Sequence, residues 1–175
     1  QPLASSYAVL SEDEKDLGVC LIDIGGGTTD IAVWTQGAIR HTSVMPIAGD
    51  QVTNDIAMAL RTPTREAEDI KIRFGCALTH MAYASESIDV AGVDDRPSRK
   101  LSRRALADVI QPRVEELFEL IQHELRRAGF EDVLSSGIAL TGGASAMPGM
   151  VELGEEIFHM PVRLGSPKYT GSLAD

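Results

Sequence analysis

A run of glycines beside acidic residues is the first feature of this sequence that could do chemistry. Asp23 and Ile24 are followed by Gly25, Gly26, Gly27, Thr28, Thr29 and Asp30. Successive glycines let the backbone approach a ligand closely and turn N–H groups into one concavity, which suits phosphate oxygens. Thr28 adds a hydroxyl donor, and the Asp23 carboxylate can hold Mg²⁺ directly or through water. The alternative is a tight hairpin whose aspartates are merely solvated.

A second glycine motif occurs near the C-terminal end, where Gly142 and Gly143 follow an apolar run ending at Thr141. We expect a buried strand to end at this pair and a helix to open after it. Such a turn offers free N–H groups and the positive end of a helix dipole to an anion or a nucleoside. An ordinary strand-to-helix turn is the alternative. Neither motif is a dinucleotide fingerprint or a Walker loop, because no helix follows the first and no Gly-Lys-Ser/Thr is present.

A basic cluster stands out in an otherwise acidic chain. It consists of Arg96, Arg99, Lys100, Arg103 and Arg104. Cations at a helix start are slightly unfavourable to the helix dipole, which favours an acidic partner as the reason for their placement. The alternative is the solvated edge of a hairpin.

The composition excludes several classes of protein. The chain has 175 residues, of which 43% are hydrophobic, and 16 Lys and Arg against 26 Asp and Glu give a net charge of −10. This charge disfavours non-specific binding to nucleic acid or anionic lipid. No apolar stretch approaches the roughly 20 residues that span a bilayer. Cys20 and Cys76, like the four histidines, lack the spacing of metal ligands, so we expect a reduced compartment and packing roles.

The elements that must position these motifs follow from apolar periodicity. Three strands are predicted at 19–24, 31–34 and 39–47, after a short helix in 2–15 that places Leu3, Tyr7 and Leu10 on one face. Further elements are helices at 50–61, capped by Asp50, and at 64–74, a hairpin within 85–100, a long helix at 102–128, a strand at 137–141, a helix at 150–159 and a strand at 161–164. Pro112 predicts a kink or two abutting helices within the long helix. The order predicts an α/β fold in which a mixed sheet carries flanking helices.

Two glycine turns about 115 residues apart resemble those of the actin-like ATPase superfamily, whose lobes have a ribonuclease H-like fold. There the first motif is the second phosphate loop and the second is the adenosine loop. The chain resembles more closely the FtsA family of bacterial cell-division proteins, through PLASSYAVLSEDEKDLGVCLIDIGGGTTDIAVW, IRHTSVMPIAGDQVTNDIA, AEDIKIRFGCA and GIALTGGASAMPGM. The resemblance implies a large actin-like subdomain at 1–79 and 129–175 and a small α+β subdomain inserted at 80–128.

The resemblance also implies roles in binding ATP and Mg²⁺. Asp23 would organise Mg²⁺ and water, and Gly25 to Gly27 with Thr28 would hold the β- and γ-phosphates. Gly142 and Gly143 would pass under the nucleoside, with Met147 against adenine. A Glu-x-x-Lys pair clamps ribose and base in the superfamily, and Glu68 and Lys71 have that spacing. A solvated pair on one helix face is the alternative for these two.

The function implied is an ATP-binding cell-division scaffold, at most a weak ATPase. It would link filaments of the tubulin-like FtsZ to the cytoplasmic face of the inner membrane at the division site, self-associate and contact other divisome proteins. The basic cluster would receive the C-terminal tail of FtsZ. The alternatives are a pilus-assembly or cell-shape ATPase, a lobe of a sugar or acid kinase, and a plain α/β module with two structural turns.

Two parts of the family pattern are not found in the sequence. No Asp-x-Gly motif of a first phosphate loop precedes residue 20, and nothing after Leu164 has the apolar face and cations of an amphipathic membrane helix. We therefore expect this chain to supply half of the nucleotide site, to be inactive alone as an ATPase, and to reach the membrane only through a segment outside it.

Overall fold

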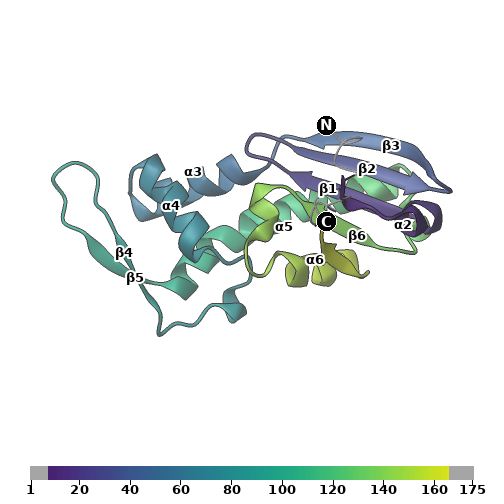
Figure 1. Cartoon of the computed structure of the whole chain (residues 1–175). Helices are drawn as coiled ribbons and strands as arrows, with labels where there is room; N and C mark the ends of the chain where they lie inside the picture. Colours follow the sequence, from purple (N-terminus) through teal and green to yellow (C-terminus); the bar gives the residue numbers. More distant parts are fainter. Residues whose placement is uncertain (1–7, 166–175) are drawn as a thin grey trace, which may run out of the picture.

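A five-stranded mixed sheet forms the centre of the molecule (Figure 1). The computed structural model describes residues 8–165. The strand order is β3-β2-β1-β6-β7, in which the first three strands form an antiparallel meander and the last two continue the sheet in parallel with β1. The strands are β1 (Val19–Ile24), β2 (Thr29–Thr35), β3 (Ala38–Met45), β6 (Ile138–Thr141) and β7 (Val162–Leu164).

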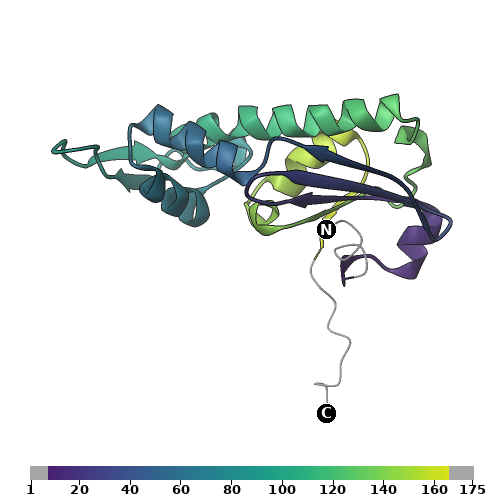
Figure 2. The same ribbon diagram turned by 90° about the horizontal axis from the view of Figure 1, so that it is seen from above.

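Both faces of the sheet are covered, which explains why β1 is apolar almost throughout. Figure 2 shows the helices α5 (Arg103–Arg127) and α6 (Met150–Phe158) on one face, where Phe118 and Phe158 pack with the sheet core. On the other face Val9 and Leu10, next to α2 (Glu12–Leu17), pack against Trp34. In residues 8–165 no helix is both long and apolar enough to cross a bilayer.

A smaller group of elements lies at the end of the molecule away from α2 (Figure 1). It contains the start of α5, two further helices and a separate two-stranded antiparallel sheet. The Thr62 hydroxyl donates to the Ala91 carbonyl (2.8 Å), and the Arg103 guanidinium donates to the Phe74 carbonyl (3.0 Å). These elements are α3 (Gly49–Leu60), α4 (Thr64–Phe74), β4 (Ser87–Val90) and β5 (Arg99–Ser102). The division of the chain at 80–128 stays a prediction, although α3 and α4 lie beside the β4–β5 hairpin.

The α/β class and the element order predicted from the sequence are confirmed. The strands and helices differ from their predicted bounds by one or two residues in most cases, and three 3₁₀ turns were not anticipated: η1 (Thr79–Met81), η2 (Glu131–Val133) and η3 (Gly143–Ala146).

Two local predictions were wrong. The two abutting helices expected at Pro112 do not form: residues 103–127 are one continuous helix, held by buried side chains on both sides of the proline, and a kink there stays a prediction. Asp50 does not cap α3: the N-cap is Ala48, and Asp50 lies in the first turn. The short helix predicted in 2–15 falls largely outside the described residues, as do its Leu3 and Tyr7; within the described part Ala8 and Val9 are helical, and α2 follows from Glu12.

An ion pair joins the two ends of the described chain. The Arg163 guanidinium on β7 donates to both Glu14 carboxylate oxygens (2.7 and 2.8 Å) and to the Val9 carbonyl (2.8 Å). Burial raises the pKa of Glu14, but the hydrogen bonds from Arg163 and from the Ser11 backbone and side chain outweigh burial and hold this pKa below its ordinary value. The charged form of Glu14 is therefore favoured by folding.

We expect Glu14→Gln to lower the free energy of unfolding at pH 7 by about 1 kcal/mol, because a charge-assisted bidentate pair is replaced by weaker neutral bonds. Since folding lowers the pKa of Glu14, the stabilisation by this ion pair is fully present above the ordinary carboxyl pKa of 4.5. The stabilisation is lost as the pH falls through the pKa that Glu14 has in the folded protein. Urea unfolding at pH 7 and at pH 3 measures both effects. Asp13→Asn, an exposed change on the same helix, is the control, and an equal difference between Glu14→Gln and the unchanged chain at both pH values would contradict the prediction.

Candidate functional site

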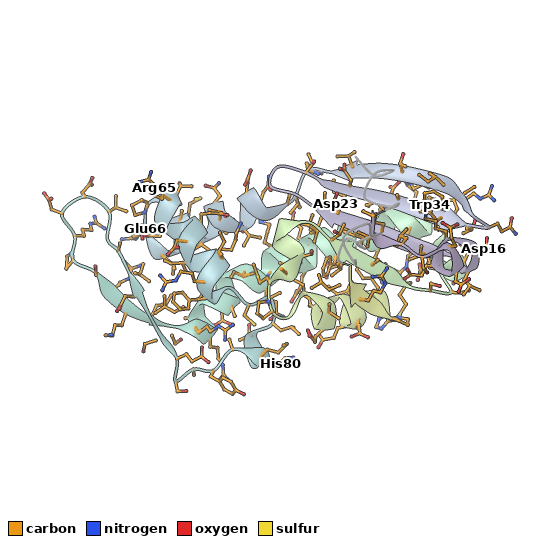
Figure 3. The ribbon with its side chains drawn as sticks, in the orientation of Figure 1. Asp16, Asp23, Trp34, Arg65, Glu66 and His80 are labelled. Carbon is orange, nitrogen blue, oxygen red and sulfur yellow. The ribbon has the colours of Figure 1, made fainter. Side chains whose placement is uncertain are left out.

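The two glycine turns lie side by side at one edge of the sheet. β1 and β6 are adjacent and parallel, with Asp23 opposite Thr141, so both strands end at the same level. Each strand then enters its glycine turn within a residue or two. Figure 3 shows Asp23 between the sheet and the group of α3 and α4. Ligands of open α/β sheets bind at such carboxyl ends, which makes this edge the candidate site.

The first turn is closed by a hydrogen bond from the Gly25 N–H to the Thr28 carbonyl (3.0 Å). Gly26, Gly27 and Thr28 are exposed, and within residues 8–165 the N–H groups of Gly26 and Gly27 have no hydrogen-bond acceptor. The turn also supports α3, because its carbonyls accept from the backbone N–H groups of Gly49 (3.0 Å) and Asp50 (2.8 Å). These bonds satisfy two of the N–H groups that a helix start leaves unpaired, so α3 needs no side-chain cap.

The second turn touches the first. Gly142 has a φ of +93°, and a Cβ there would lie 2.7 Å from an Asp23 carboxylate oxygen and still closer to the Ile24 carbonyl. The 3₁₀ turn η3 follows directly, and α6 begins only at Met150. The glycine pair therefore opens only a 3₁₀ turn, and the helix predicted at 150–159 follows as α6. The dipole of α6 does not point out of Gly142 and Gly143.

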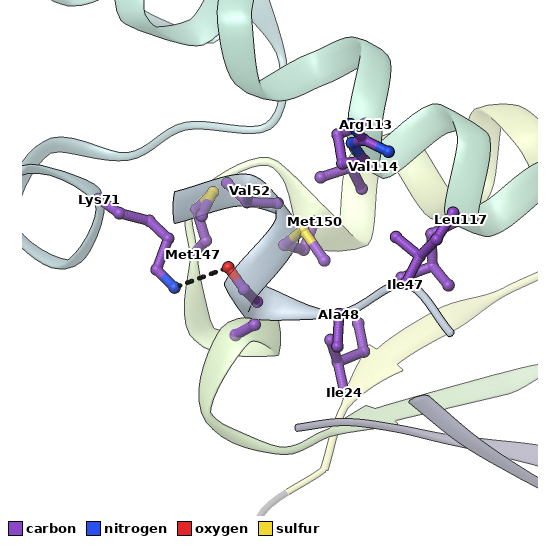
Figure 4. Close-up of a pocket in the computed structure, with 12 residues that line it drawn as sticks. Ile24, Ile47, Ala48, Val52, Lys71, Arg113, Val114, Leu117, Met147 and Met150 are labelled. Atoms are coloured by element: carbon purple, nitrogen blue, oxygen red, sulfur yellow. Dashed lines mark hydrogen bonds between the residues drawn. The ribbon is translucent and has the colours of Figure 1, made fainter. Parts of the chain in front are cut away.

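A buried lysine ties α4 to the start of α3. Lys71 is 8% exposed, and its ammonium donates to the Gly49 carbonyl (3.1 Å), as Figure 4 shows. The same ammonium pairs with Glu68 (3.0 Å). The Thr53 hydroxyl donates to the same Glu68 oxygen. The bond from Thr53 and the bond and charge of Lys71 lower the pKa of Glu68 below its ordinary value. Glu68 and Lys71 thus belong to a network inside the site, where Lys71 is not a solvated side chain.

These parts line one cleft of about 280 Å³. Its lining residues are Gly25, Gly26, Gly49, Asp50, Glu68, Lys71, Ile72, Gly143 and Ala144. An adjoining hollow of about 150 Å³ shares Lys71, Ile72, Gly143 and Ala144 and extends to Ala146, Met147 and Pro148. Of the residues singled out in the sequence, Gly25, Gly26, Glu68, Lys71, Gly143 and Met147 therefore line this cleft or the hollow that shares residues with it.

The other predicted residues lie around this space. Asp23 and Gly142 are behind it, at the contact of the two turns, while Gly27 and Thr28 are exposed on the first turn and do not line it. Sequence reasoning missed Gly49, Asp50, Ile72 and Ala144. The Gly49-Asp50 pair directly after a strand was a usable signal, since small residues at a helix start often allow close approach of a ligand.

The five cations of the basic cluster have different surroundings in the structure. Arg99 donates to the Leu60 carbonyl, Arg103 to the Phe74 carbonyl and Arg104 to the Ala82 carbonyl, so these three cations fasten the hairpin and the start of α5 to their neighbours. Lys100 points outward and pairs with Asp89 on the opposite strand (3.3 Å), with both side chains exposed. Arg96, in the hairpin connection, is exposed and has no side-chain partner within residues 8–165.

Comparison with known sequences gives one family. The family model described as "Cell division protein FtsA" matches residues 20–175. The cell division protein FtsA of Pseudomonas aeruginosa is 67% identical over 100% of this chain and 42% of its own length. The cell division protein FtsA of Escherichia coli K12 is 50% identical over 99% of this chain and 43% of its own length. The chain thus spans less than half the length of the curated relatives it matches.

Comparison with solved structures gives an actin-like fold. MreB5 of Spiroplasma citri, solved bound to AMPPNP, has a TM-score of 0.75 at 24% identity, covering 87% of this chain and 49% of that one. The same protein bound to ADP has a TM-score of 0.73 over 88% of this chain and 50% of that one, at 22% identity. MamK, solved as a double helical filament, has a TM-score of 0.65 at 17% identity, covering 83% of this chain and 49% of that one. The expected actin-like lobe with a mixed sheet is confirmed.

The two adjacent glycines of the second turn should respond differently to a methyl group. We expect Gly142→Ala to lower the free energy of unfolding by about 3 kcal/mol, because its φ is positive and its Cβ would collide with backbone. Gly143→Ala should change it by less than about 0.5 kcal/mol, since a Cβ there has no atom within 4 Å. Urea denaturation measures both, and equal losses in the two variants would contradict this geometry.

Proposed function

The chain belongs to the FtsA family of cell-division proteins, and we propose that it binds Mg-ATP at its two glycine turns and acts as a scaffold in division. The observation that carries this proposal is the single cleft lined by Gly25, Gly26, Glu68, Lys71 and Gly143. Further support comes from MreB5, whose structures of similar fold contain ADP and AMPPNP.

The proposed orientation of the nucleotide follows from the chemistry of the cleft. Phosphate oxygens in the cleft would accept from the Gly26 N–H, and those that reach the exposed part of the first turn would accept from the Gly27 N–H and the Thr28 hydroxyl. Glu68 and Lys71 would contact the ribose, and the small residues Gly143 and Ala144 would let the nucleoside lie close to the backbone. The whole-protein site is proposed to include residues beyond this chain, since the relatives are more than twice as long.

Mg²⁺ fits this arrangement as an ion held mainly by phosphate oxygens and water. Within residues 8–165 no three Asp, Glu, His or Cys side chains gather as a metal cage. Mg²⁺ is commonly bound by one or two carboxylates together with substrate phosphates. Asp23, at the contact of the two turns, is the residue proposed to hold it, directly or through water, and the ion would neutralise phosphate charge beside an acidic chain.

We propose that turnover is slow at most, so that ATP serves as a ligand. The Glu68 carboxylate already accepts hydrogen bonds from Thr53 and Lys71, and its lowered pKa makes it a weak base. A bound nucleotide would instead fix the angle between this lobe and the rest of the polypeptide. That angle would bias contacts between neighbouring copies.

Nucleotide binding should fall with the size of the side chain at position 143. We expect Gly143→Ala to weaken Mg-ATP binding about threefold and Gly143→Val more than tenfold, because the added groups extend into open space of the cleft. The affinity is measured by calorimetric titration of Mg-ATP into a longer polypeptide that contains these 175 residues and has the full length of the relatives. Urea unfolding of the same variants is the control for folding. Wild-type affinity in Gly143→Val would contradict the proposed site.

The scaffold role is proposed to rest on binding the C-terminal tail of FtsZ at the β4–β5 hairpin. Support comes from the family and from two exposed cations, Arg96 and Lys100, in a chain of net charge −10. Acidic groups of the tail would be attracted to these cations through water, with an affinity that falls as salt screens the charges. The link to the cytoplasmic face of the inner membrane at the division site is proposed to involve residues beyond this chain.

Charge reversal at the hairpin tests the FtsZ contact. We expect Arg96→Glu with Lys100→Glu to weaken binding of an FtsZ C-terminal tail peptide about tenfold in 50 mM salt and less in 300 mM salt, measured by calorimetry. The hairpin should stay folded because neither side chain donates to backbone. A double variant with the same charge change away from the hairpin, Arg40→Glu with Arg126→Glu, is the control. Equal losses in both variants would show that net charge and not the hairpin is responsible.

Self-association is also proposed, since MamK of similar fold forms a filament. The lobe is elongated, with α2 at one end and the β4–β5 hairpin at the other, and the proposed contact joins the α2 end of one copy to the hairpin end of the next (Figure 1). Such a heterologous contact between unlike ends produces open chains of subunits.

A further inference from the structure

One ion pair joins α3 to α5 near the candidate site. Asp55 is in the middle of α3, and Arg113 is on α5 directly after Pro112. The Arg113 guanidinium donates through two of its nitrogens to both Asp55 carboxylate oxygens (2.7 and 2.8 Å). Among the described residues, the lining of the cleft and of the adjoining hollow includes neither side chain.

The geometry of this pair fixes one helix against the other. Two parallel hydrogen bonds set the orientation of a guanidinium against a carboxylate as well as their separation. The Arg113 side chain is 30% exposed and that of Asp55 is 23% exposed, so water screens this pair less than a pair on the open surface. Donation to Asp55 raises the pKa of Arg113 above its ordinary value. Arg113 also pairs with Glu116 of its own helix (3.3 Å), whose side chain is more exposed.

Packing around the start of α3 is incomplete. An internal cavity of about 20 Å³, room for about one water molecule, lies between α3, α5 and the second glycine turn (Figure 4). Its lining includes Gly49 and Val52 of α3, Ala144 and Met147 of the second turn, and Arg113. A void leaves the atoms around it without contacts on one side, so the start of α3 has space in which to shift.

The start of α3 matters to the site because it supplies part of the cleft. Gly49 and Asp50 are the first residues of α3, and both line the cleft. Gly49 also gives its carbonyl to Lys71 (3.1 Å), so the position of this ammonium depends on α3 as well. Asp55 lies roughly one and a half turns further along the same helix, and a helix of this length transmits a shift at Asp55 to its start.

We propose that Asp55 and Arg113 are positioning residues, whose ion pair holds the start of α3 at the place where the cleft binds nucleotide. This inference rests on the proposed function, because nucleotide affinity is the property that the pair controls. The pair acts through Gly49, Asp50 and Lys71 and does not itself contact the nucleotide. Without the pair, the start of α3 moves into the cavity and these three residues are misaligned.

An exchange of the two charges tests the inference, because each single variant removes the pair and the double variant restores it. The variants are Asp55→Arg, Arg113→Asp and the two together, in a longer polypeptide that contains these 175 residues and has the full length of the relatives. The same exchange at Arg126 and Glu131, which pair at the far end of α5 (2.6 Å), is the control. Calorimetric titration of Mg-ATP measures affinity, and urea unfolding measures stability.

We expect each single variant at Asp55 and Arg113 to weaken Mg-ATP binding about tenfold, and the double variant to return to within about threefold of the unchanged protein. Independent effects would instead multiply to a loss of about a hundredfold in the double variant. The control exchange should change Mg-ATP affinity by less than about twofold, because that pair lies away from α3. The milder variant Arg113→Lys keeps the charge but cannot form the two parallel bonds, so it should weaken binding about threefold.

Different results separate this inference from the proposed function. If the single variants lose stability in urea but bind Mg-ATP as the unchanged protein does, the pair is only structural and the inference is overturned. The inference also fails if the double variant does not regain affinity, or if the control exchange weakens binding equally. Where the exchange variants do not fold, unchanged affinity in Arg113→Lys overturns it. If the unchanged protein does not bind Mg-ATP, the proposed function itself fails, and the inference with it.

Discussion

Parallel pairing of β1 with β6 is the constraint on which the rest of the site depends. The two strands are more than a hundred residues apart in sequence, yet their register sets Asp23 opposite Thr141 and ends both strands at one level. Gly25 directly follows β1 and Gly142 directly follows β6, so the two turns meet at this edge of the sheet. Gly142 then lies so close to Asp23 and Ile24 that any side chain at this position would push the turns apart.

Lys71 has a comparable role between the helices. A buried ammonium is costly unless its charge and its hydrogen-bond donors are satisfied. Here Glu68 on the same helix supplies the charge and Gly49 on α3 supplies a carbonyl, so the hydrogen bond to Gly49 persists only while α3 and α4 keep their relative position. The same network orients the Glu68 carboxylate toward Thr53. Hydrogen bonds and an ion pair thus hold the Glu68 and Lys71 side of the cleft, whereas the glycine turns line it with backbone.

The order of elements and most of the residues that line the cleft could be predicted from the sequence. Long apolar runs predict buried elements, and consecutive glycines predict turns that a ligand can approach closely. Prediction failed where a tertiary contact replaced a local signal. Asp50 looked like a helix cap, but backbone carbonyls of the glycine turn take the N–H groups that a cap would serve. Pro112 looked like a break, but burial on both sides keeps the helix whole. Ile72 gave no signal, since nothing local distinguishes an isoleucine facing a cleft from one facing a core.

Hydrogen bonds anchor α3 at both of its ends. The helix begins on the carbonyls of Gly25 and Gly26, and the carbonyl of Leu60 at its far end accepts from Arg99 of the hairpin. Its 12 residues make a rod of about 18 Å. A tilt of about 5° at the glycine turn would move the far end by about 1.5 Å, half the length of a hydrogen bond. A helix anchored in this way converts a small tilt at the glycine turn into a larger displacement at the β4–β5 hairpin.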